Sequence, residues 1–154
     1  AAPGYEGERY SVVQFCHPRP WTILSPVPSC CTPEQPRRFH ALSAADALAG
    51  EGISVEVFDP RSLVPFDRDG LRASLEKTGR LVVAHEAAQR GGFGAEIAAI
   101  AAGECFDLLR APVIRVCGTN TPMPYAPELE GFVIPDAARI ADGIRSLLAA
   151  EVPG

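Results

Sequence analysis

The sequence lacks an excess of basic residues and any apolar run long enough to cross a bilayer. Of its 154 residues, 14 are Lys or Arg and 19 are Asp or Glu, which gives a formal net charge of −5. Because nucleic-acid binding needs clustered Lys and Arg, we expect no nucleic-acid partner. A membrane-spanning helix needs about 20 apolar residues, and no basic-then-apolar signal peptide opens the sequence. We therefore expect a cytoplasmic protein, or one of the mitochondrial matrix if it is eukaryotic.

The five cysteines match neither a metal site nor a disulfide framework. Their number is odd, Cys30 and Cys31 are adjacent, and neither Cys-x-x-Cys nor His-x-x-x-His occurs. A zinc site built from Cys30, Cys31 and His40 would have a spacing that no known motif uses. Cys105 and Cys117 lie in apolar segments, which predicts core residues with a raised thiol pKa. We predict no metal ligands.

The length and the apolar content of 47% are typical of one globular domain, but the sequence has two unlike parts. Residues 1–39 are rich in proline, which removes backbone donors and prevents helices and central strands. Their only strand-like run is 10–15, and we expect no regular element between Pro18 and Arg38. A frameshifted reading frame and a genuine extension both explain such a segment, which we expect to be irregular or disordered.

Residues 40–154 alternate between helical and strand patterns. The predicted helices cover about residues 41–49, 68–78 and 95–108 and a last segment from Pro135 onward; the predicted strands cover 53–58, 81–84 and 113–116. Residues 10–15 are the candidate for a missing first strand. The predicted fold is therefore α/β, with an open, mostly parallel sheet in a three-layer α/β/α arrangement.

Two motifs near the end of the second predicted strand are candidates for a functional site. His85 and Glu86 follow the strand, where open α/β sheets place functional groups. The turn Gly91–Gly94 precedes a helix, but Ile97 stands where a dinucleotide-binding turn needs its third glycine. No Gly-x-Ser-x-Gly elbow or P-loop occurs. One hypothesis is a stand-alone small α/β enzyme or nucleotide-binding domain that uses these residues; tight packing at a subunit contact is the other.

The residues of four motifs resemble those of one known protein module. They are His85-Glu86-Ala87, Gly91-Gly92-Phe93, Glu104-Cys105-Phe106 and Arg115-Val116-Cys117-Gly118. They resemble the transketolase-like C-terminal domain of the β subunit of thiamine-diphosphate-dependent 2-oxo acid dehydrogenases (E1), most closely the branched-chain type. The resemblance runs from about His40 to Ala150 and does not include residues 1–39.

The resemblance implies a role in assembly rather than in catalysis. In such enzymes thiamine diphosphate and Mg²⁺ lie between the α subunit and the N-terminal domain of the β subunit. We therefore expect no catalytic or cofactor-binding residue here, and an inactive isolated chain. The implied partners are the E1 α subunit, a second β subunit and the acyltransferase E2. The candidate interface residues are His85, Glu86, Gly91, Gly92, Phe93, Gly94, Met123, Pro124 and Tyr125.

Acyltransferase docking in related β subunits uses acidic residues near the chain end. Glu128, Glu130 and Asp136 are candidates for this role. Arg110 stands where relatives often carry an acidic residue, so we expect weak or lost docking to a basic partner.

Overall fold

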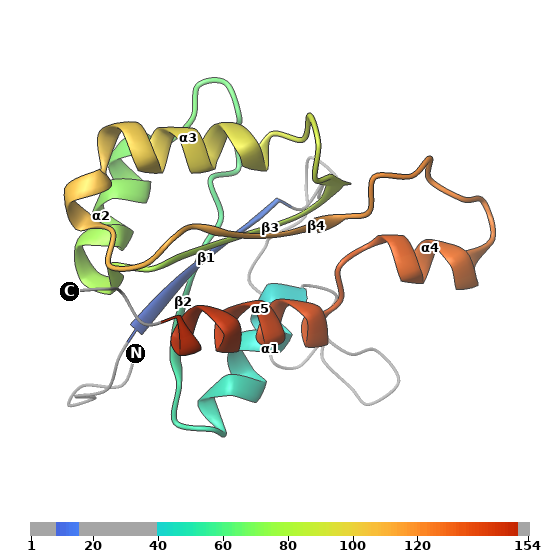
Figure 1. Cartoon of the computed structure of the whole chain (residues 1–154), viewed down its shortest axis with the longest axis horizontal. Coiled ribbons are helices and arrows are strands. Elements are labelled where there is room, and N and C mark those ends of the chain that lie inside the picture. The colour runs from blue at the N-terminus through green and yellow to red at the C-terminus, as the bar shows by residue number, and fades with distance from the viewer. Residues whose placement is uncertain (1–8, 16–39, 151–154) are drawn as a thin grey trace.

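A four-stranded parallel sheet forms the middle layer of the protein (Figure 1). The computed structural model describes residues 9–15 and 40–150. The strand order is β2-β1-β3-β4, and the strands are β1 (Arg9–Phe15), β2 (Ser54–Phe58), β3 (Leu81–Ala88) and β4 (Ile114–Gly118). The prediction of an open parallel sheet is confirmed.

Two helices cover each face of the sheet (Figure 1). On one face α1 (His40–Ala49) and α5 (Ala137–Ala149) pack over Val82 and Ala84. On the other, α2 (Arg68–Thr78) and α3 (Gly94–Glu104) pack over Leu81 and Val83. Successive side chains of β3 point to opposite faces, so one continuous apolar strand serves both cores. The predicted three-layer arrangement is confirmed.

The first strand comes from the part of the sequence that precedes residue 40. The candidate run 10–15 forms β1, which pairs with β2 on one side and with β3 on the other. The sheet therefore includes a strand on the N-terminal side of the predicted boundary. Residues 16–39, with Cys30 and Cys31, lie outside the described part of the chain, as do 1–8 and 151–154.

The helix ends follow the local signals. The Asp67 carboxylate accepts a hydrogen bond from Gly70 N at 2.9 Å and begins α2. Gly79 ends the helix with a φ of 65°, a left-handed conformation that favours glycine. At α5, the Asp136 carboxylate accepts from Arg139 N at 2.8 Å. The last helix therefore starts at Ala137, just after the predicted Pro135.

The structure differs from the predictions at several element ends and adds one helix. β3 continues past Ala84 to Ala88, because His85 pairs with Cys117 and Ala88 with Gly118. α3 ends at Glu104, and a separate 3₁₀ turn, η2 (Phe106–Leu108), follows it. The short helix α4 (Pro127–Val133) was not predicted. It lies beyond the end of β4, away from the sheet (Figure 1).

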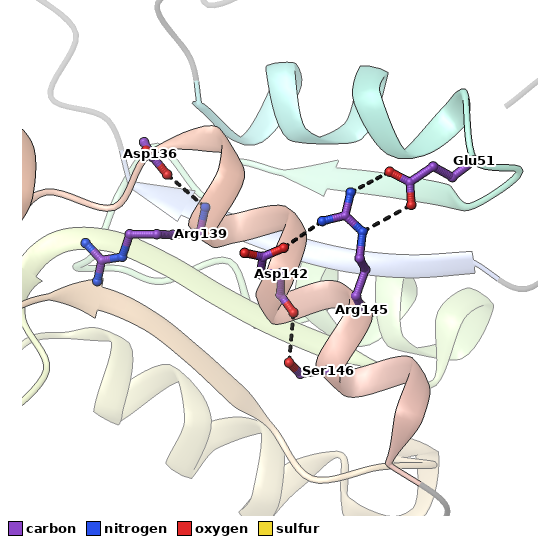
Figure 2. A network of polar contacts seen from close by, with 6 residues as sticks. All are labelled: Glu51, Asp136, Arg139, Asp142, Arg145 and Ser146. Carbon is purple, nitrogen blue, oxygen red and sulfur yellow. Dashed lines mark hydrogen bonds and ion pairs between the residues drawn. The ribbon is translucent and has the colours of Figure 1, made fainter.

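A charged contact joins α5 to the turn after α1. The Arg145 guanidinium donates to Glu51 Oε2 at 3.1 Å, contacts Glu51 Oε1 through Nη2, and donates to Asp142 Oδ1 at 2.6 Å (Figure 2). The bond to Glu51 raises the pKa of Arg145 and lowers that of Glu51. Because these groups are exposed, solvent screening limits their contribution to stability.

None of the helices in residues 40–150 is long and apolar enough to span a membrane.

Candidate functional site

His85 is the centre of the candidate site at the carboxyl end of β3. Its side chain is buried, with 4% of its surface exposed. Nε2 lies 3.2 Å from Sγ of Cys117, the residue opposite it on β4. The neighbouring Glu86 side chain is exposed, and as the next residue of the strand it points to the face opposite His85. The two residues therefore do not form the acid–base pair of the stand-alone enzyme hypothesis.

The glycines of the turn pack against His85. A methyl group added at Gly94 would overlap the imidazole ring, and one added at Gly92 would meet its Cε1 atom and the Ala88 carbonyl oxygen. Gly91 has a φ of 76°, so a side chain there would be strained. The glycines of the turn thus allow a helix to approach a buried histidine closely.

Burial keeps the His85–Cys117 pair neutral. Desolvation lowers the pKa of His85, and the nearby positive charge of Arg115 lowers it further. Desolvation also raises the pKa of the Cys117 thiol, against smaller opposing effects of Arg115 and Arg139. An activated cysteine nucleophile needs a lowered thiol pKa. The pair is therefore a packing contact between neutral groups, as the sequence predicted for Cys117.

The amino end of α3 does not fit a nucleotide phosphate or a diphosphate. Phosphate-binding helix ends offer free backbone N–H groups and a positive dipole end. Here Glu96 places a negative charge in the first turn, and the His85 ring fills the space beside Gly92 and Gly94. The nucleotide-binding hypothesis loses its geometric support. Across residues 9–15 and 40–150, no three His, Cys, Asp or Glu side chains are grouped to hold a metal ion.

Phe93 lines an apolar groove. Its ring lies 6.3 Å from that of Phe66, centroid to centroid, in a tilted arrangement. The groove has a volume of about 950 Å³, with Val64, Pro65 and Ile100 among its lining residues. Val64 is 87% exposed. The groove therefore presents apolar surface between the β2–α2 loop and α3.

A second apolar surface lies on the segment 121–133, which we call the α4 arm. Its large apolar side chains are exposed: Met123, Tyr125, Leu129 and Phe132. Pro124 is half-buried, and the carbonyl of Val133 accepts a hydrogen bond from Thr119 N at 3.2 Å. Exposed apolar side chains this close together are typical of interaction surfaces.

The predicted interface residues are divided among three places. His85 and Gly94 lie together in a buried contact, Met123 and Tyr125 are on the α4 arm, and Phe93 is in the groove. Gly91 and Gly92 also line the groove, and Gly92 contacts His85 as well. Sequence reasoning missed Val64, Leu129 and Phe132. Their exposure depends on where the loop and α4 lie, and the only sequence signal was apolar residues beside Pro65 and Pro127.

The open parallel sheet with two helices on each face defines a three-layer α/β domain. Residues 37–140 match the family described as "Transketolase, C-terminal domain", and the chain belongs to this family.

The relatives are β subunits of larger enzymes. The chain is 50% identical over 96 residues to 2-oxoisovalerate dehydrogenase subunit beta 2, mitochondrial, of Arabidopsis thaliana, covering 62% of this chain and 26% of that protein. It is 44% identical over 108 residues to the acetoin:2,6-dichlorophenolindophenol oxidoreductase subunit beta of Bacillus subtilis (70% and 32% covered). It is 43% identical over 114 residues to pyruvate dehydrogenase E1 component subunit beta-2, mitochondrial, of Oryza sativa (74% and 30%). The chain thus spans about a quarter to a third of the length of these relatives.

A solved structure has a similar fold. A split-gene transketolase, described as an inactive β4 tetramer, superposes with a TM-score of 0.65 and 26% identity, covering 96% of this chain and 40% of that one.

Proposed function

We propose that this chain is the C-terminal domain of the β subunit of a thiamine-diphosphate-dependent 2-oxo acid dehydrogenase (E1), and that it serves subunit assembly. The observation that carries the proposal is the similarity to β subunits of three such enzymes or close relatives over 62–74% of the chain. The neutral His85–Cys117 pair and the exposed apolar side chains of the groove and the α4 arm support a role in contacts rather than in chemistry.

We further propose the branched-chain type, which acts on 2-oxo acids such as 3-methyl-2-oxobutanoate. The support is the motif wording together with 50% identity to the 2-oxoisovalerate enzyme, against 44% and 43% for the acetoin and pyruvate relatives. On this proposal thiamine diphosphate and Mg²⁺ belong to other parts of the assembled enzyme. We propose that the assembled enzyme is located in the bacterial cytoplasm or the mitochondrial matrix.

The proposed partners are the E1 α subunit, a second β subunit and the acyltransferase E2. The candidate contact surfaces are the apolar groove around Phe93 and the α4 arm with Met123, Pro124 and Tyr125. The Gly91–Gly94 turn lies beside the groove, since Gly91, Gly92 and Phe93 line it while Gly92 and Gly94 pack on the buried His85 ring. Glu86 is a candidate contact residue through its exposed side chain.

A domain replacement tests the proposal. The C-terminal domain of the Arabidopsis β subunit is exchanged for this chain and co-expressed with the Arabidopsis α subunit. We expect co-purification with the α subunit and retained decarboxylation of 3-methyl-2-oxobutanoate. The same exchange into the Bacillus acetoin enzyme should assemble less well, if the branched-chain assignment is right. A chimaera that is folded by circular dichroism but does not bind either α subunit would contradict the assembly role.

Docking to the acyltransferase should be weakened by Arg110. This residue is exposed; its backbone N donates to Gly79 O at 2.7 Å, and its side chain lies over Gly79. An arginine there repels a basic binding domain and lowers its association rate. In surface plasmon resonance at low salt, Arg110→Glu should therefore bind that domain faster than wild type, and Arg61→Glu, at an exposed arginine of the loop between β2 and α2, should not. Equal rates for Arg110→Glu and wild type would refute this effect.

A further inference from the structure

A second cavity lies at the carboxyl end of the edge strand β4. It has a volume of about 490 Å³ and is lined by Gln89, Arg115, Thr119, Asn120, Arg139 and Asp142. This volume is in the range of small-molecule sites. The cavity shares no lining residue with the apolar groove.

Two half-buried arginines from different elements meet at this cavity. Arg115 belongs to β4, and its Nη1 donates to the carbonyl oxygen of Gln89 at 2.9 Å. Arg139 belongs to α5; its Nη2 donates to the carbonyl oxygen of Cys117 at 3.0 Å and its Nη1 to that of Val133 at 3.5 Å. In Figure 2 the Arg139 side chain leaves α5 in a different direction from Arg145. Each guanidinium carries five N–H donors, so donors remain on both after these bonds.

The positive charge of the two arginines is not balanced by a carboxylate. Among the residues that the structure describes, neither Arg115 nor Arg139 forms an ion pair. Asp142 is the one carboxylate among the described lining residues, and it is bound to Arg145 at 2.6 Å. The excess charge reaches the neighbouring side chains, because Arg115 lowers the pKa of His85 and both arginines oppose the raised pKa of Cys117.

We propose that this cavity is a binding site for a small anion that carries a carboxylate or phosphate group. Half-buried cations without a counter-charge are costly, and an anion between them restores the balance. The planar guanidinium matches carboxylate and phosphate oxygens with paired N–H donors. Asn120 adds a donor: its Oδ1 accepts from Arg90 N at 2.8 Å, which leaves the amide NH₂ for a ligand.

The test is calorimetric titration of the full chain at low ionic strength. The probes are inorganic phosphate and the carboxylate 3-methyl-2-oxobutanoate, with sodium chloride at matched ionic strength as the reference. We expect saturable binding of at least one probe and none of chloride; the stronger probe identifies the ligand class. Arg115→Gln should weaken binding by about tenfold or more, because it removes a charge-assisted hydrogen bond. Arg61→Gln, at an exposed arginine outside the cavity, should leave binding unchanged.

Arg139→Gln removes the second guanidinium and should have the same effect as Arg115→Gln. Because Arg139 also contacts the end of β4, the fold of the Arg139→Gln variant is first checked by circular dichroism. If that variant is unfolded, the test rests on Arg115→Gln alone. No saturable binding of either probe by wild type, or binding that Arg115→Gln does not weaken, would overturn the proposal. The result is independent of the domain replacement, which measures assembly with an α subunit.

Discussion

Gly94 and Gly103 lie in the same helix, α3, but in opposite surroundings. Gly94 is buried against the His85 ring, whereas Gly103 is exposed and nothing lies within 4 Å of a methyl group added there. The pair separates two roles of glycine. One glycine is required for close approach, and the other only weakens the helix.

Gly94→Ala should therefore lower the free energy of unfolding by roughly 1–3 kcal/mol, because the added methyl forces the His85 ring to move. Gly103→Ala should raise it by roughly 0.5–1 kcal/mol through helix propensity alone. Urea unfolding followed by circular dichroism measures both. If the two substitutions shift the midpoint in the same direction, the packing of α3 on His85 is not as described.

His85 should also make stability depend on pH. Burial lowers the pKa of His85 in the folded protein below its ordinary value of 6.5. Below that value the unfolded chain binds more protons than the folded one. The free energy of unfolding should therefore be unaffected well above pH 6.5, fall as the pH drops through it, and level off below the folded-state pKa.

The comparison of wild type with His85→Gln isolates this contribution. All other titrating groups are shared, so only the difference between the two pH profiles is interpreted. Urea unfolding at several pH values from about 8 to about 5 should give a shallower profile for the variant. Parallel profiles would mean that His85 does not lose a proton on folding.

At the scale of the element, α5 depends on its first turn. The Asp136 carboxylate accepts from Arg139 N, and Arg139 then reaches the carbonyl oxygen of Cys117 at the end of β4. Figure 2 shows Asp136 beside the backbone nitrogen of Arg139. The cap therefore sets the start of the helix that carries one of the two cavity arginines.

Asp136→Ala should lower the free energy of unfolding by about 1 kcal/mol, the usual cost of losing a helix cap. Asp136→Asn keeps an acceptor oxygen and should lose much less. Chemical denaturation of the two variants beside wild type gives the comparison. An alanine variant as stable as the asparagine variant would show that the carboxylate hydrogen bond contributes nothing.

At the scale of the whole molecule, the exposed apolar side chains should promote self-association. Phe132 on the α4 arm is 78% exposed, and Phe106 on the 3₁₀ turn after α3 is 75% exposed. The two phenylalanines are matched in exposure but lie on different elements. If the α4 arm is a contact surface, only the first should affect association.

Phe132→Asp should shift light scattering after size-exclusion chromatography toward the monomer, while Phe106→Asp should behave as wild type. A buried charge in an apolar contact is costly, whereas a charge in solvent is not. Circular dichroism should be the same for all three. A wild-type chain that is already monomeric at high concentration, or equal effects of the two substitutions, would place the contact surface elsewhere.

The sequence by itself determined most of the helices and strands, because their signals are local. Apolar periodicity, the Asp67 cap and the Gly79 stop act within one or two turns of the chain, and the structure bears them out. α4 was missed although Pro127 and two acidic residues stand in its first turn, because a helix of seven residues is too short for apolar periodicity to mark it. The wording of the motifs also indicated the family correctly.

Tertiary structure decided the rest, because it depends on contacts between distant residues. Residues 10–15 had a strand-like composition, but only pairing with β2 and β3 places them inside the sheet. Likewise, nothing in the sequence around His85 predicted that the glycine turn packs on its imidazole ring. Arg115 and Arg139 lie on a strand and a helix, and only the approach of α5 to the end of β4 brings their charges to one cavity. The burial of a side chain such as His85, and a positive charge without a counter-charge, depend on which distant segments contact each other.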